Sequence, residues 1–232
     1  MRIALVGNGR MGQAIQALAA SRDDELVTVI SGEENRSGEM LTADRLDAAE
    51  VVLEFTHPTV APMNLLRLAQ LGMPVVSGTT GWSERLPEVE AAFTAGTGAL
   101  LHSANFSVGV HLFLRAAAVV AAGFKGRPEY EEFILEAHHK HKLDAPSGTA
   151  LRLQAAVRHA DRDRDFPVSS IRAGAIAGMH RLSYDSAGES ISLNHTARGR
   201  EPFAAGALAA ADWLRGRRGV HRFEAMLFGE EG

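Results

Sequence analysis

The chain contains no cysteine, which excludes disulfide bonds, thiol nucleophiles and cysteine-ligated metals. It also lacks a large charge of one sign: the formal net charge of the 232 residues is −4, so bulk electrostatics do not favour nucleic acid. No apolar run approaches the roughly 20 residues that a membrane-spanning helix needs. We therefore expect an ordered cytoplasmic protein with no nucleic-acid partner and no membrane partner.

The first 20 residues combine the patterns of a strand, a glycine-rich turn and a helix. Residues 2–6 predict a buried strand, apolar residues recur at helical spacing from Met11 to Ala19, and between them lies Gly7-Asn8-Gly9-Arg10-Met11-Gly12. A G-x-G-x-x-G sequence in this context is typical of dinucleotide binding, because the glycines permit a tight turn, the approach of a pyrophosphate and close packing of the helix. An ordinary tight turn is the alternative.

The second predicted strand, residues 26–30, ends at the position where an acidic residue normally binds the adenosine ribose. This chain has Ser31 there, with Glu33, Glu34 and Arg36 nearby. A carboxylate favours NADH, whereas Ser31 with Arg36 would tolerate the 2′-phosphate of NADPH. The sequence thus leaves the choice between NADH and NADPH open.

Strand and helix patterns alternate as far as residue 102, with strands at 51–55, 74–77 and 99–102 and helices at 62–71 and 86–95. This alternation predicts an α/β fold with a parallel, doubly wound sheet, whose ligand lies at the carboxyl ends of the strands. Polar or glycine-containing turns follow three of these strands. We expect them to line the nicotinamide and its ribose through Phe55, Thr56, Gly78, Thr79, Thr80, Ser103, Ala104, Asn105 and Phe106.

The second half departs from the alternation. After a helix at 108–122, strand patterns appear at 131–137, 168–173, 180–184 and 190–194. They predict an α+β domain with a mixed or antiparallel sheet. We expect a dinucleotide-binding domain over residues 1–105 and a substrate-binding and oligomerisation domain over 106–204. A helix at 203–214 would start a C-terminal segment, about 205–232, that packs back on the first domain.

Residues 136–150 place basic side chains directly before a helix start. Pro146 favours an extended or turn conformation, and Ser147 is a good N-cap for a helix through Val157. The free amides of Ser147, Gly148 and Thr149 would then bind an anion, and His138 and Lys142 could deliver protons to it. A solvated loop without a functional role is the alternative.

A metal site is a second alternative for this stretch, since His138 and His141 could form half of one. The sequence has no His-Glu-x-x-His motif and no second histidine pair at ligand spacing, so we expect no metal. Farther on, Arg200 could bind a second carboxylate through its bidentate guanidinium. A solvated arginine near a helix start explains the same spacing equally well.

Six segments together resemble the 4-hydroxy-tetrahydrodipicolinate reductase (dihydrodipicolinate reductase) family: residues 7–12, 54–58, 77–81, 104–109, 136–150 and 195–207. The resemblance implies NAD(P)H-dependent hydride transfer to C4 of a dicarboxylate cyclic imine in lysine and diaminopimelate biosynthesis. By motif position it implies that His138 and Lys142 donate protons and that His139, Gly148 and Thr149 bind the substrate. It also implies a homotetramer assembled through the sheet of the second domain.

The chain departs from the family pattern at several positions. Ser31 replaces a frequent acidic residue, the segment 32–50 is short, and the glycine loop is one residue shorter than the commoner form. Met179 and His111 replace a usual Glu and a frequent Asn. Two rival readings stay open: another nicotinamide-dependent oxidoreductase of a small carboxylate, and a non-catalytic dinucleotide sensor.

Overall fold

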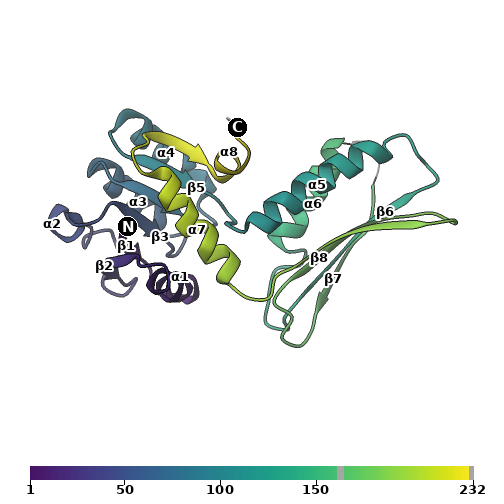
Figure 1. Cartoon of the computed structure of the whole chain (residues 1–232), viewed down its shortest axis with the longest axis horizontal. Coiled ribbons are helices and arrows are strands. Elements are labelled where there is room, and N and C mark those ends of the chain that lie inside the picture. Colours follow the sequence, from purple (N-terminus) through teal and green to yellow (C-terminus); the bar gives the residue numbers. More distant parts are fainter. Residues whose placement is uncertain (161–164, 230–232) are drawn as a thin grey trace. The chain divides into compact units, whose positions relative to one another are not determined.

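The structure is a computed structural model that describes residues 1–160 and 165–229. The described residues form two compact units. Val108–Gly199 make up the second unit, and the segments before and after them make up the first. The expected domain boundaries, after residues 105 and 204, lie within a few residues of these. Each unit has a sheet of its own (Figure 1) and a hydrophobic core of its own.

The first unit is built on a parallel six-stranded sheet in the order β10-β5-β4-β3-β1-β2. Helices cover both faces, so the prediction of a doubly wound α/β fold is confirmed. The strands are β1 Arg2–Val6, β2 Glu25–Ile30, β3 Val51–Glu54, β4 Pro74–Ser77, β5 Ala99–His102 and β10 Gly219–Arg222. The helices are α1 Arg10–Ala20, α2 Ala43–Leu46, α3 Ala61–Gln70, α4 Leu86–Ala95, α7 Glu201–Leu214 and α8 Phe223–Phe228, with a 3₁₀ turn, η1, at Ser83–Arg85.

Side chains of the central strands alternate between two cores, because successive residues of a strand point to opposite faces. In β1, Ile3 and Leu5 enter the core formed with α1, α7 and α8. Ala4 and Val6 enter the core formed with α3 and α4. Continuous apolar strands of this kind are typical of sheets that are buried on both faces.

The chain after residue 200 returns to the first unit. α7 packs against α1, and β10 adds a sixth strand beside β5. The sequence did not predict β10 or α8, because Gly219–Arg222 is short and has no apolar run that would mark a strand. The helix predicted at 203–214 begins at Glu201, with Pro202 in its first turn, a position that suits proline.

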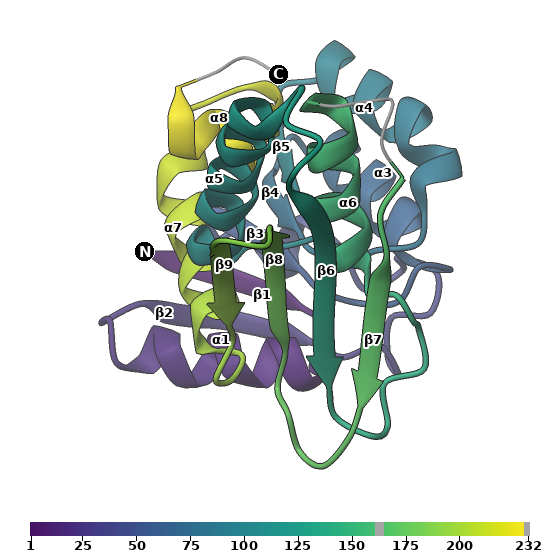
Figure 2. The same ribbon diagram turned by 90° about the vertical axis from the view of Figure 1, so that its right-hand side faces the viewer.

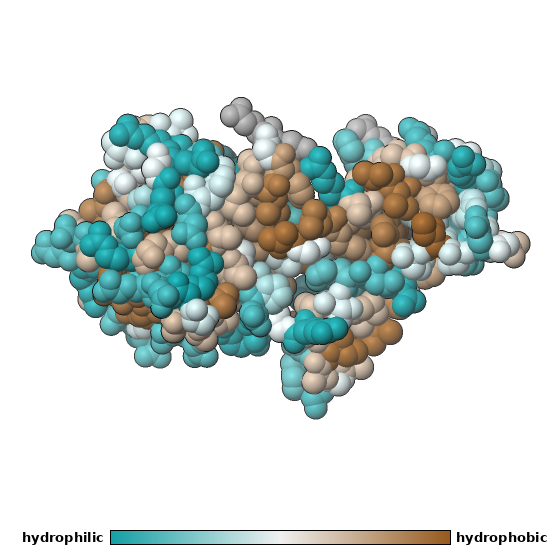
Figure 3. Space-filling view, in the orientation of Figure 1, coloured by the Kyte–Doolittle hydropathy of each residue, from teal (hydrophilic) through white to brown (hydrophobic). Residues whose placement is uncertain are grey.

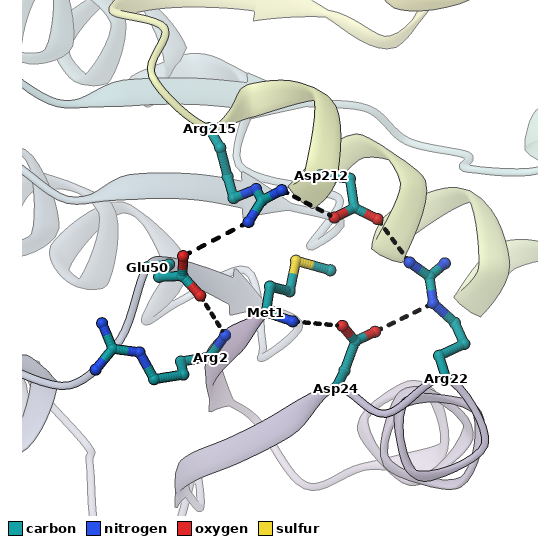
Figure 4. A network of polar contacts seen from close by, with 7 residues as sticks. All are labelled: Met1, Arg2, Arg22, Asp24, Glu50, Asp212 and Arg215. Carbon is teal, nitrogen blue, oxygen red and sulfur yellow. Dashed lines mark hydrogen bonds and ion pairs between the residues drawn. The ribbon is translucent and has the colours of Figure 1, made fainter.

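An ion-pair network connects α7 to residues at the starts of β1, β2 and β3 (Figure 4). Arg22 Nη2 lies 2.6 Å from Asp212 Oδ2, and Arg215 Nη1 lies 3.5 Å from Glu50 Oε1. The full set is Met1, Arg2, Arg22, Asp24, Glu50, Asp212 and Arg215. The pairs that involve Asp212 and Arg215 are partly exposed and contribute at most about 1 kcal/mol each, so the buried apolar face of α7 supplies most of the attachment.

The second unit is a four-stranded sheet in the order β7-β6-β8-β9. β6 and β7 are parallel, and the other neighbours are antiparallel, so the sheet is mixed, as predicted. Figures 1 and 2 show α5 and α6 side by side on one face of this sheet. The elements are α5 Val108–Phe124, β6 Glu131–His138, α6 Gly148–Ala160, β7 Val168–Arg172, β8 Met179–Asp185 and β9 Ser190–Thr196.

The helical layer of the second unit is not wholly polar on its outer side. Leu112 and Val119 of α5 and Leu151 of α6 are exposed. In the space-filling view, hydrophobic surface gathers over α5 and α6 (Figure 3). None of the described helices is long and apolar enough to cross a membrane.

Gly206 gives a test of how α7 is attached. It lies in the middle of the helix, where an added Cβ would come 1.7 Å from the carbonyl oxygen of Phe106. A backbone atom cannot move aside cheaply, so we expect Gly206→Ala to destabilise the protein by about 3 kcal/mol. Gly123→Ala in α5 is the matched control, since a Cβ there meets nothing within 4 Å and should change stability by at most about 1 kcal/mol. Thermal unfolding measures both, and equal melting temperatures would contradict this packing.

Candidate active site

The glycine-rich sequence follows β1 and continues into the first turn of α1, and its three glycines have different surroundings. Gly7 has a φ of +103°, and a Cβ on it would come 2.1 Å from the carbonyl oxygen of Phe55. A Cβ on Gly12 would come equally close to the carbonyl oxygen of Gly7, whereas a Cβ on Gly9 would meet nothing within 4 Å. Gly7 and Gly12 are thus required by the fold. Gly9, at the N-terminus of α1, leaves open space where an anion could approach.

A cavity of about 240 Å³ opens beside this loop. It brings together residues that follow β1, β3 and β4, at the carboxyl edge of the sheet where ligands of this fold class bind. Predicted cofactor residues supply all of its lining except Pro58. The lining residues are Gly9, Arg10, Met11, Phe55, Thr56, Pro58, Gly78, Thr79 and Thr80.

Other predicted cofactor residues do not line this cavity. The side chain of Phe106 lies in the hydrophobic core, 5.0 Å between ring centroids from Phe223. Asn8 accepts a hydrogen bond from Gln16. Ser103 and Asn105 stabilise their own turn: Ser103 Oγ donates to the Asn105 carbonyl, and Asn105 Oδ1 accepts from the Ser107 amide. Ala104 is exposed beside them.

The residues that follow β2 include both kinds of side chain that can recognise the adenosine ribose, a carboxylate and a guanidinium. Glu34 folds back so that its Oε1 accepts a hydrogen bond from the Ser31 amide at 3.1 Å, and Arg45 Nη1 lies 3.8 Å from the same oxygen. The side chain of Arg36 is exposed two residues farther on. A carboxylate and a guanidinium are therefore both available, which accords with the use of NADH or NADPH.

Sequence reasoning missed Glu54, a fully buried carboxylate at the end of β3. It accepts hydrogen bonds from the hydroxyl groups of Thr56, Ser77 and Thr79, the last two at 2.7 and 3.1 Å. Thr79 Oγ1 in turn accepts from the Thr56 amide at 2.8 Å. Burial raises the pKa of Glu54, and these hydrogen bonds oppose the shift. Glu54 thus holds together two of the loops that line the cavity.

In the second unit, a buried carboxylate organises the predicted proton donors. Glu136 has 0% exposure. Its Oε2 contacts His138 Nδ1, and its Oε1 accepts from Arg172 Nη2 at 2.7 Å. Glu136 and His138 lie on one face of β6 because they are two residues apart, and Arg172 of β7 pairs with His138 in register. The Arg172 guanidinium also donates to the carbonyl oxygen of Asp144.

Burial governs the protonation of the histidines in this cluster. It lowers the pKa of His138, although the hydrogen bond and charge of Glu136 oppose the shift. Burial, together with the proximity of His138, lowers the pKa of His180 to about 4. Burial also lowers the pKa of His195. All three imidazoles are therefore mainly neutral near pH 7.

Ser147 caps α6 as predicted. Its Oγ accepts a hydrogen bond from the Ala150 amide at 3.2 Å and lies 3.0 Å from His180 Nε2. The cap uses one of the four amides that a helix N-terminus leaves unpaired. The described residues provide no acceptor for the amides of Gly148 and Thr149, so this end of α6 can bind an anion.

The loop between β6 and α6 carries Lys142, His139 and His141. Lys142 Nζ forms an ion pair of 2.8 Å with Asp144 Oδ1, and the Lys142 hydrogen bond lowers the pKa of Asp144. His139 is partly buried, and its Nδ1 has no hydrogen-bond partner among the described residues. His141 is exposed.

Glu136, His138 and His180 are a possible metal-binding group, since their ligand atoms lie within 4.8 Å of one another. Both oxygens of Glu136 are already engaged, one by His138 and one by Arg172. An ion would have to displace a charged guanidinium from a buried carboxylate, which is costly. His141 is exposed and does not belong to the group, so the pair that the sequence singled out does not form its core.

Arg200 lies in the first unit, at the N-cap position of α7. Its side chain is exposed and forms no hydrogen bond or ion pair with the part of the chain that the structure describes.

Comparison with known families accounts for the sequence of both units. The N-terminal domain of dihydrodipicolinate reductase matches residues 1–106, and the C-terminal domain of the same protein matches residues 109–227. The chain belongs to the dihydrodipicolinate reductase family. Relatives named 4-hydroxy-tetrahydrodipicolinate reductase include that of Christiangramia forsetii, 32% identical over 98% of both chains. That of Alkalilimnicola ehrlichii is 37% identical over 93% of this chain and 94% of its own.

Solved structures of this and related folds resemble the whole chain. The dipicolinate-bound dihydrodipicolinate reductase of Paenisporosarcina sp. TG-14 matches with a TM-score of 0.77 and 22% identity, over 96% of this chain and 97% of its own. An amine dehydrogenase from Mycobacterium smegmatis matches with a TM-score of 0.63 and 9% identity, over 95% and 94%. At these identities the likeness concerns the fold, which the reductase family shares with other dehydrogenases.

A substitution at Gly9 tests cofactor binding in this family member without disturbing the fold. Because a Cβ at Gly9 meets nothing in the structure, we expect Gly9→Ala to leave the melting temperature unchanged. The same methyl group would occupy the space of a pyrophosphate, so the Kd for NADPH and NADH, measured by fluorescence titration, should rise about tenfold or more. Gly12→Ala, which collides with backbone, should instead lower the melting temperature. An unchanged Kd for NADPH and NADH in a folded Gly9→Ala protein would show that this loop is not part of the cofactor site.

Proposed function

We propose that the protein is a 4-hydroxy-tetrahydrodipicolinate reductase, which uses NADH or NADPH to reduce a dicarboxylate cyclic imine at C4 in lysine and diaminopimelate biosynthesis, and that it acts in the cytoplasm. The observation that carries the proposal is the juxtaposition at the start of α6. An unpaired helix N-terminus lies in the same unit as Lys142 and a carboxylate-bound His138. This combination offers both anion binding and proton transfer, which a dicarboxylate undergoing reduction needs.

The binding residues follow from the positive potential of this region. The amides of Gly148 and Thr149 and the Ser147 hydroxyl would bind one carboxylate of the substrate, with His139 beside them. Arg200, whose guanidinium is exposed, is our candidate for the second carboxylate. The bound nicotinamide supplies the hydride, and the protein supplies position and charge.

Lys142 has the clearest proton-transfer role. In the structure its ammonium group is paired with Asp144, an exposed carboxylate that a substrate carboxylate could replace. Lys142 would then remain charged against the substrate and donate a proton as negative charge develops during hydride addition. His138, held by Glu136, is the second candidate donor.

The assay that tests this function measures oxidation of NADH and of NADPH separately, with substrate generated in situ by the upstream synthase from pyruvate and aspartate semialdehyde. We expect oxidation that depends on the synthase. In the same assay, Lys142→Ala should lower kcat/KM at least about 100-fold, because general acid catalysis typically contributes that much. Its Kd for the cofactor should stay within about twofold of the parent value.

Lys142→Arg is the matched control for charge. It keeps the cation for substrate binding but is too weak an acid to donate a proton, so it should restore KM more than kcat. Cofactor binding without oxidation in the unaltered protein would favour a dinucleotide sensor instead. Full activity in Lys142→Ala would remove Lys142 from the mechanism without affecting the reductase assignment.

We also propose that the protein is a homotetramer assembled through the sheet of the second unit. α5 and α6 cover one face of this sheet (Figure 2). Side chains on the other face include Phe133 and Leu135 of β6, which are only partly buried, and Ile171 of β7, which is 44% exposed. Apolar side chains left uncovered on a sheet face are typical of an interaction surface.

The assembly is tested with two isoleucines of equal exposure. Ile171 lies on the uncovered face, whereas Ile191 of β9, also 44% exposed, pairs with Tyr184 on the helix-covered side. We expect Ile171→Asp to convert the tetramer to smaller species in light scattering, because a buried unpaired charge is costly at an interface. Ile191→Asp should leave the mass unchanged. A monomeric parent protein, or a tetramer in both variants, would contradict the proposed interface.

A further inference from the structure

We propose that Glu136 and Arg172 are positioning residues for catalysis: Glu136 holds the Nδ1–H of His138, so that Nε2 is the nitrogen that exchanges a proton with the substrate, and Arg172 keeps Glu136 in that role. The inference rests on the proposed function, because it assigns how one of the proposed donors works. None of the motifs that single out His138 and Lys142 includes Arg172.

The register of the sheet brings these groups together. Glu136 and His138 point to the same face of β6. Arg172 of β7 is the partner of His138, and His180 of β8 is the partner of Glu136. The groups that face His138 are therefore Glu136 from its own strand, Arg172 from β7, His180 from β8 with ring centroids 5.1 Å apart, and Lys142 from the following loop.

The charge of Glu136 decides the tautomer of His138. Burial raises the pKa of this carboxyl, but hydrogen bonds from Arg172, Ser170 and His138 outweigh it and hold the pKa below its ordinary value. Glu136 is thus ionised and can only accept hydrogen bonds. His138 Nδ1, which contacts its Oε2, must then carry a hydrogen, and the neutral ring has Nε2 as its unprotonated nitrogen.

Gly178 keeps space beside Nε2. Its φ is +158°, and an added Cβ would lie 3.2 Å from Nε2 of His138. The position of Gly178 is held by its carbonyl oxygen, which accepts a hydrogen bond from the Ala197 amide at 2.8 Å. A side chain at this position would crowd the nitrogen to which the proton is added.

With Nε2 of His138 as the donor, every proton in the transfer is accounted for. His138 takes a proton from solvent at Nε2, and Glu136 stabilises the resulting imidazolium. The Nε2–H bond then breaks as a bond from that hydrogen to the reduced substrate forms. The ring returns to the neutral form with its Nδ1–H still on Glu136, and no further reagent is required.

Because Arg172 is present, the substitution Glu136→Gln should change the tautomer of His138. Arg172 has only donors, so it retains the amide oxygen of the new side chain and turns the amide NH₂ towards His138. The NH₂ group can only donate, which forces Nδ1 to lose its hydrogen. The imidazolium also loses its neighbouring negative charge, which lowers its pKa.

Kinetics against pH give the first readout. We expect Glu136→Gln to lower kcat at least about tenfold while KM stays within about threefold. The alkaline limb of the kcat profile should move to lower pH, because the donor must be protonated. Glu132→Gln is the matched control, a buried carboxylate on the same face of β6, and should move neither kcat nor the limb. A folded Glu136→Gln protein with an unmoved limb and kcat within threefold of the parent would overturn the proposal.

The ring-nitrogen shifts of His138 in ¹⁵N-labelled parent protein give a second readout that does not depend on any variant folding. We expect the Nδ1–H tautomer in the parent protein and the Nε2–H tautomer in Glu136→Gln. An Nε2–H tautomer in the parent protein overturns the proposal even if the variant fails to fold. Absence of reductase activity in the parent protein would refute the proposed function, whereas the tautomer is decided without turnover.

Discussion

A carboxylate without solvent must receive its hydrogen bonds from the protein, and this constraint shapes both halves of the molecule. Glu54 and Glu136 each have 0% exposure, and each occupies the carboxyl-terminal part of its strand, where the chain turns towards a site. Leaving a buried charge unpaired costs several kcal/mol. Each carboxylate therefore holds in place the segment that supplies its partners. This segment is the 77–79 turn for Glu54 and β7 for Glu136.

The parts of the sites that could be predicted from the sequence are those in which the signal is local. Gly7–Gly12 connects a strand to a helix within the first 20 residues, and Ser147 precedes its helix directly, so spacing alone indicated both. The alternation of apolar segments similarly indicated the doubly wound sheet. In each case the physical requirement, a turn or a cap, involves neighbouring residues.

The parts that could not be predicted depend on pairing across strands. Arg172 follows Glu136 by 36 residues, and only the parallel register of β6 and β7 places its guanidinium on that carboxylate. Glu54 appears in the sequence as one polar residue in an apolar strand, and its partners Ser77 and Thr79 belong to the next strand and turn. β10 carries little apolar character of its own and forms because the edge of β5 is available.

The donors that surround the two carboxylates differ in charge, and this difference separates a structural role from an electrostatic one. Glu54 is surrounded by hydroxyl and amide groups, and burial raises its pKa. Its hydrogen bonds from Ser77 and Thr79 fix the positions of the loops. Glu136 has the Arg172 guanidinium, and its pKa is lowered. A carboxylate held ionised beside an imidazole must orient that ring and favour its protonated form. Arg172 thus makes Glu136 useful for proton transfer, whereas Glu54 serves to hold the cofactor loops together.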